Sequence, residues 1–239
     1  MLPPWLVVAL YALGAGAAIP AGAALAMNEH IRPQWLENEL RHGVIAFGAG
    51  ALLAAVALVL VPEGLNVLPL WGSASAFLAG GTGFMALDVA LARRGARKAQ
   101  TVAMLADFLP EAAALGAIAA SGAGGGPALA LLIALQNLPE GFNAYREAHD
   151  ASGASRPPFA PFLGFAALGA VAGLAGYFLL APFTAATGVV MLVAAGGILY
   201  LTFQDLAPQA RLEQHWLPAL GGVLGFLVGM VGHELLRMA

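Results

Sequence analysis

Two short polar segments interrupt the long apolar stretches in the middle of the chain. They read Gln-Asn-Leu-Pro-Glu-Gly at 136–141 and Asp-Phe-Leu-Pro-Glu-Ala at 107–112. In both segments the first and fifth residues are polar, and a spacing of four places such residues on one face of a helix. Carboxylate and amide oxygens are ligands that hard divalent cations prefer. Two helices that turn these faces toward each other could therefore form a cation site.

The four residues on these faces are Asp107, Glu111, Gln136 and Glu140, and each lies within an apolar stretch. A charge at mid-membrane costs about 2.5–3.5 kcal/mol on insertion scales. The simpler interpretation is that these polar groups only hydrogen-bond one helix to the next. The same Pro-Glu pattern occurs twice, however, and it brings three carboxylates. We therefore favour a bound ion.

The composition is that of an integral membrane protein. Of the 239 residues, 60% are hydrophobic and 10% are charged, whereas soluble domains carry about 25% charged residues. The 31 glycines suit closely packed membrane helices. No basic face indicates a nucleic-acid partner, and the absence of cysteine excludes a thiolate metal site and a disulfide framework. The lipid bilayer is the expected partner.

The apolar stretches predict an all-α fold with eight membrane-spanning helices in a single transmembrane domain, residues 1–239. The predicted spans are about 4–27, 42–61, 71–92, 100–121, 127–146, 159–181, 183–206 and 216–236. Each is close to the roughly 20 residues needed to cross the hydrocarbon core. The second span is expected to stop at Pro62, and the connections leave no room for a soluble domain.

Basic residues predict the orientation of these spans. Every Lys and Arg except Arg237 falls in or beside the first, third, fifth or seventh connection. The positive-inside rule places those connections in the cytoplasm. We therefore expect a multi-pass protein of the cell membrane with both termini on the non-cytoplasmic side.

Segment 136–141 resembles the His/Gln-Asn/Asp-x-Pro-Glu-Gly signature on the fifth helix of ZIP (ZRT/IRT-like) metal transporters, and 107–111 resembles the companion motif on their fourth. The resemblance implies a divergent bacterial-type member with a 3+2+3 helix arrangement and inverted repeats. It also implies transport of a divalent cation toward the cytoplasm by alternating access around a midplane site. Glycine-rich surfaces on spans two, three, six and eight are expected to permit sliding contacts. The metal ligands carried over are Asp107, Glu111, Gln136, Asn137 and Glu140.

The chain departs from the family pattern at several positions. Asp107 stands where the family usually has His, Phe108 where it has Asn, and Ala112 where it has Gly. Ala170 occupies the position at which many members carry a Glu that helps to hold a second metal. The resemblance therefore implies one metal site, with the second one absent.

The donor set has consequences for the ion. Without His or Cys, oxygen ligands favour harder ions such as manganese, magnesium or iron, although zinc also binds carboxylates tightly. Three carboxylates exceed the charge of one divalent cation, and a proton on Asp107 or Glu111 would balance the excess. The metal is the transported substrate, and no organic cofactor is expected.

Two other functions stay open at this point. A ZIP-fold protein that has lost metal transport could carry another solute, or act as a sensor or scaffold. A membrane hydrolase could use Asp107 and a glutamate as an acid–base pair, but the sequence offers no positioned nucleophile, so we expect no enzyme. Asp88 and Asp205 are expected either to line an exit or to lie as solvated helix ends. A homodimer is the oligomeric state left open.

Overall fold

The computed structural model is helical wherever it describes regular structure, and the described residues contain no strand. It describes residues 2–28, 34–93, 99–121, 125–152, 158–213 and 215–238, without the side chains of 34–38, 99–103, 106–107, 121, 147 and 150–152. The long helices are α1 (Pro4–Asn28), α2 (Gln34–Ala55), α4 (Leu70–Arg93), α5 (Ala99–Ser121), α6 (Gly126–Ser152), α7 (Ala160–Ala175), α8 (Thr184–Leu201) and α10 (Leu217–Met238). The short elements are the π-helical turns η1 (Val56–Leu60), η2 (Gly176–Leu180) and η3 (Thr202–Leu206), and the helices α3 (Val61–Val67) and α9 (Ala207–Ala210).

One predicted boundary is wrong, because the second helix does not stop at Pro62. Instead, α2, η1 and α3 follow one another without interruption. In a regular α-helix the ring of Pro62 would crowd the carbonyl four residues earlier. That carbonyl lies within η1, whose wider turn gives the ring room. Pro182 and Pro208 likewise follow η2 and η3 by two residues, so the same arrangement recurs.

Six helical stretches of the described chain are long and apolar enough to cross a membrane. They correspond to α1, α2 with η1 and α3, α4, α7 with η2, α8 with η3 and α9, and α10. In α5 the side chains of residues 106–107 lie outside the described part, so the apolar stretch that can be assessed there is Phe108–Ala120, and α6 carries polar residues along its second half. Within the described residues, six of the eight predicted spans are therefore long and apolar enough to cross a membrane, and the two that carry the central polar segments are not among them.

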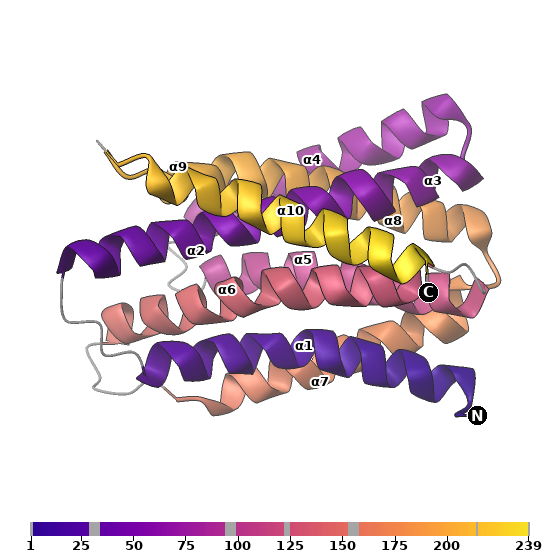
Figure 1. Cartoon of the computed structure of the whole chain (residues 1–239). Coiled ribbons are helices and arrows are strands. Elements are labelled where there is room, and N and C mark those ends of the chain that lie inside the picture. The colour runs from indigo at the N-terminus through magenta and orange to yellow at the C-terminus, as the bar shows by residue number, and fades with distance from the viewer. Residues whose placement is uncertain are drawn as a thin grey trace.

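Figure 1 shows α5 and α6 in the middle of the molecule, running lengthwise beside the other long helices. They pack against α1 and α7, and we call these four helices, with η2, the first bundle. The remaining elements form the second bundle, in which α2 packs on α10 and α4 packs on α8. The first bundle meets the second where α6 contacts α2 and α10, and where α5 contacts α8.

Paired glycines bring the helices together within each bundle. A Cβ atom added at either glycine of a pair would lie about 2 Å from a backbone carbonyl oxygen of the partner helix. That oxygen always belongs to the residue three positions before the partner glycine, so each crossing is reciprocal. The pairs are Gly22–Gly141 (α1 and α6), Gly116–Gly176 (α5 and η2), Gly50–Gly225 (α2 and α10) and Gly80–Gly196 (α4 and α8). The glycine-rich helix surfaces that were expected to permit sliding thus contain glycines in direct backbone contact with the neighbouring helix. Small residues allow helix backbones to approach this closely.

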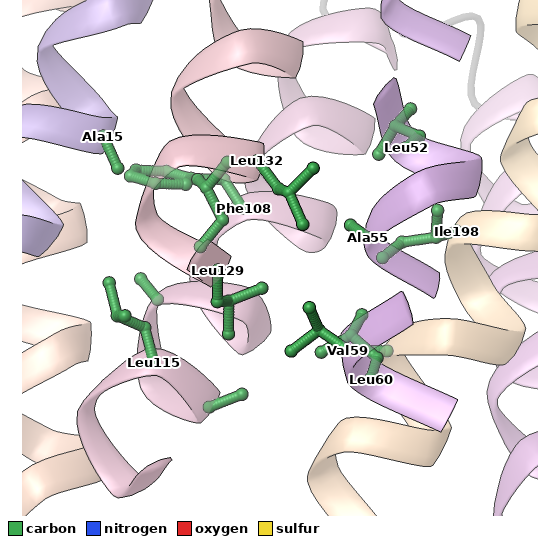
Figure 2. Close-up of a cluster of buried hydrophobic side chains, with 14 of the residues drawn as sticks. Ala15, Leu52, Ala55, Val59, Leu60, Phe108, Leu115, Leu129, Leu132 and Ile198 are labelled. Atoms are coloured by element: carbon green, nitrogen blue, oxygen red, sulfur yellow. The ribbon is translucent and has the colours of Figure 1, made fainter. Parts of the chain in front are cut away.

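Apolar side chains fill the space between the two bundles. Figure 2 shows side chains of α5 and α6 on one side of this core and those of α2, η1 and α8 on the other. The fully buried residues that it labels include Leu60, Leu115, Leu129, Leu132 and Ile198. Side-chain packing therefore joins the bundles to each other, whereas backbone contacts join the helices within them.

Candidate functional site

Glu111 of α5 and Gln136 of α6 meet in the interior of the first bundle. Both side chains are 0% exposed, and Nε2 of Gln136 donates a hydrogen bond to Oε2 of Glu111. A buried carboxylate is costly unless hydrogen bonds or an opposite charge compensate for the lost water. The structure thus brings together one predicted residue from each of the two Pro-Glu segments.

Glu140 lies one helical turn after Gln136 on α6, at a spacing that shares a face. Its side chain is half-buried. Pro139 beside it packs against α2, where a Cβ atom at Gly48 would lie 3.0 Å from Cγ of the proline ring. This part of α6 therefore borders the interface between the two bundles.

Asn137 is also fully buried, but it is tied to a different helix. Its Nδ2 donates a hydrogen bond of 3.0 Å to the backbone carbonyl of Ala15 in α1. Successive helical residues are rotated by about 100°, so Asn137 lies on the face next to that of Gln136. The amide nitrogen of Asn137 links α6 to α1, and this contact leaves its oxygen available.

Three buried amide oxygens on α6 have no hydrogen-bond partner: Oε1 of Gln136, Oδ1 of Asn137 and Oδ1 of Asn143. An unsatisfied buried acceptor costs about 1–3 kcal/mol, and native structures contain few of them unless water, an ion or a ligand binds there. Asn143 is absent from the predicted ligands. Its position, seven residues after Gln136 and three after Glu140, is the helical spacing that could have identified it.

Asp107 lies on α5 one turn before Glu111, but its side chain is outside the described part of the structure. Its neighbour Phe108 is fully buried and packs against α1 and α7. A Cβ atom added at Gly16 of α1 would lie 2.9 Å from the Phe108 ring, and one added at Gly169 of α7 would lie 2.1 Å from it. An aromatic ring without ligand atoms thus fills the position at which the family pattern has an asparagine.

Other polar groups lie outside this site. The hydroxyl of Tyr200 in α8 donates a hydrogen bond of 3.0 Å to Asp88 in α4, which joins these two helices. A groove of about 410 Å³ lies beside Tyr200 and Gln204, and none of the predicted ligands lines it. Within the described residues, no group of three or more His, Cys, Asp and Glu side chains could hold a metal ion. Among the described residues, an ion bound to Glu111 would therefore need amide oxygens as well as carboxylate oxygens to complete its ligands.

The site is therefore a buried carboxylate–amide pair with further amide oxygens along one helix. This donor set suits a hard cation, and it could also hydrogen-bond a polar solute. The function is therefore inferred from the residues of this site and not from a related protein. The chain matches no family model, and no curated protein matches it.

Proposed function

We propose that the chain is a ZIP-like carrier that moves a divalent metal cation across the cell membrane toward the cytoplasm. The observation that carries the proposal is the fully buried Glu111–Gln136 pair, with amide oxygens beside it that lack partners. A contact that only joined two helices would not require Oε1 of Gln136 and Oδ1 of Asn137 to stay unsatisfied. A cation would satisfy such oxygens and neutralise the carboxylate together.

The ion would bind between α5 and α6. Rotation of the Gln136 side-chain amide by about 180° would exchange the positions of Nε2 and Oε1. The amide group that now donates a hydrogen bond to Glu111 would then present its oxygen to the ion. Glu111 and Glu140 supply two negative charges for a divalent cation. Such oxygen donors favour manganese or iron, and zinc also binds carboxylates. Asp107, one turn from Glu111, adds a third carboxylate that can take up a proton.

In the proposed topology, α5 and α6 cross the membrane together with the six apolar spans, which gives eight crossings. Their polar residues are compatible with this because other helices cover them: α6 contacts α1, α2, α5 and α10, and α5 contacts α1, α7 and α8. Intramembrane ionisable residues usually face the interior of a helix bundle in this way. Both chain ends lie at the same end of the molecule in Figure 1, as an even number of crossings requires.

Metal-dependent thermal stabilisation of the purified protein tests the proposal. A ligand that binds only the folded state stabilises it, by about 2.7 kcal/mol at a hundredfold excess over Kd. We expect MnCl₂ or ZnCl₂ to stabilise the wild type and proteoliposomes to take up the metal. Glu111→Ala and Glu140→Ala should lose both responses and still fold, because the loss of a costly buried charge does not by itself unfold a helix bundle.

Thr202→Val is the matched control. Thr202 is buried in the second bundle, and its hydroxyl donates to the carbonyl of Ile198 at 2.8 Å, so this variant should keep both metal responses. If the Glu111→Ala/Glu140→Ala double variant takes up metal at the wild-type rate, these two residues do not form the transport site. A wild type that neither binds nor takes up metal would instead favour a protein that carries another solute, or senses or scaffolds.

A further inference from the structure

We infer that Asn143 is the first ligand on the release side of the α5–α6 site, where its amide oxygen receives the ion after Glu140. The inference rests on the proposed function. Asn143 is 9% exposed, and its Oδ1 has no hydrogen-bond partner. An amide oxygen that stays buried and unsatisfied needs an occupant that the protein itself does not supply.

The position of Asn143 on α6 connects it to the site. Gln136, Glu140 and Asn143 are separated by four and three residues, a spacing that aligns them on one helix face. At a rise of 1.5 Å per residue, Asn143 lies about 4.5 Å further along the helix axis than Glu140. Ligands on adjoining turns can share an ion during its transfer.

The opposite direction along the same face of α6 offers no ligand. The residues three, four and seven positions before Gln136 are Ile133, Leu132 and Leu129, all of them fully buried. Figure 2 shows Leu129 and Leu132 with Leu115 of α5 in the apolar core. An ion at Glu111 therefore meets polar groups on α6 only toward the C-terminal end of this helix, which is cytoplasmic in the proposed topology.

The chemistry of Asn143 suits release better than capture. A neutral amide oxygen replaces one water of the hydration shell but adds no charge, so it holds a cation more weakly than Glu111 or Glu140 does. Conduction requires binding strong enough for entry and weak enough for exit. A step from charged to neutral ligands meets that requirement.

The test compares Asn143→Leu, which removes the oxygen at similar volume, with Asn143→Asp, which keeps one. We expect Asn143→Leu to retain the Mn²⁺-induced rise in Tm, because Glu111, Gln136 and Glu140 are intact, and to lower Mn²⁺ uptake in proteoliposomes about tenfold. Asn143→Asp should keep more uptake than Asn143→Leu, because an oxygen ligand remains, but less than the wild type, because the added negative charge holds the ion more tightly and slows its release. Asn66→Leu, the same substitution at an exposed residue of α3, should change neither measurement.

The two readouts separate the possible failures. Wild-type uptake by Asn143→Leu, in a protein whose wild type transports Mn²⁺, would show that Asn143 does not contact the moving ion. Loss of Mn²⁺-induced stabilisation in Asn143→Leu would place Asn143 in the central site, which also overturns its release role. If the wild type shows no metal response, the proposed function and this inference fall together. The Tm without metal checks folding, and Asn143→Ala repeats the test if the leucine variant does not fold.

Discussion

The two bundles bury polar residues of different kinds. In the second bundle, the buried polar residues of the described chain are the hydroxyl residues Ser73, Thr187 and Thr202. Each of these hydroxyls donates to a backbone carbonyl close to it in the sequence. In the first bundle, they are Glu111, Gln136, Asn137 and Asn143. Three of these four residues keep an amide oxygen without a partner, which is the property expected of a binding site.

Backbone packing does not explain this difference, because both bundles contain the same reciprocal glycine crossings. The ligand-type residues are therefore an addition to a common packing scheme, and they occur in one bundle. One ring nitrogen in the second bundle, Nδ1 of His233 in α10, is also buried without a partner. Buried polar groups alone therefore do not distinguish the two bundles, whereas unsatisfied amide oxygens beside a buried carboxylate do.

The largest expected effect tests the shared packing. Gly80→Ala in the second bundle and Gly22→Ala in the first should each lower the free energy of unfolding by about 3 kcal/mol, the upper range for overpacking. In both, the new Cβ would lie 2.0 Å from a carbonyl oxygen. Gly83→Ala and Gly14→Ala are the controls on the same helices, because a Cβ at either meets nothing within 4 Å. Equal unfolding energies for all four variants would show that the crossings do not hold the bundles.

The second prediction tests the polar contrast directly. Loss of a residue that only hydrogen-bonds a metal ligand weakens metal binding roughly 10–100-fold. Gln136→Leu should weaken Mn²⁺ binding by more than that, because it removes a proposed ligand. Thr187→Val should cost about 0.5–1.5 kcal/mol of stability for its lost hydrogen bond and leave metal binding unchanged. Titrations of Tm with MnCl₂ measure both. If the two variants respond alike to Mn²⁺, the bundles do not differ in function.

The third prediction concerns selectivity within the first bundle. Asp107→His should raise the ratio of Zn²⁺ to Mn²⁺ uptake, because imidazole favours borderline-soft ions and one negative charge is lost. A shift of about tenfold would correspond to about 1.4 kcal/mol of differential binding. Competition uptake in proteoliposomes measures the ratio. An unchanged ratio would argue that Asp107 does not touch the ion.

The smallest expected effect tests the contact between the bundles. Gly48→Ala would place a Cβ 3.0 Å from the ring of Pro139, a side-chain contact that a small shift can relieve. We expect the stability to change by less than about 1 kcal/mol, measured by chemical or thermal unfolding. A loss as large as that of Gly80→Ala would mean that the bundles are joined as rigidly as the helices within them.

Local patterns predicted much of this molecule. Apolar stretches indicated the long helices and the membrane class, because a helix closes its own backbone hydrogen bonds within one segment. The four-residue spacing of the Pro-Glu segments placed the polar residues of each on one face, and Glu111 and Gln136 do meet across α5 and α6. These features depend on residues close together in the sequence, so the sequence was sufficient to predict them.

The tertiary structure decided which neighbours each face meets. It placed α5 and α6 in the centre, turned Asn137 toward Ala15, and packed Phe108 beside Gly16 and Gly169. Residues far apart in the chain pair at the glycine crossings, and no local pattern states which glycine meets which. The sequence by itself therefore determined the helices and the chemistry on their faces. Only the packing of those helices decided that Gln136, Asn137 and Asn143 would be buried with unsatisfied oxygens, because burial depends on the helices that cover a face.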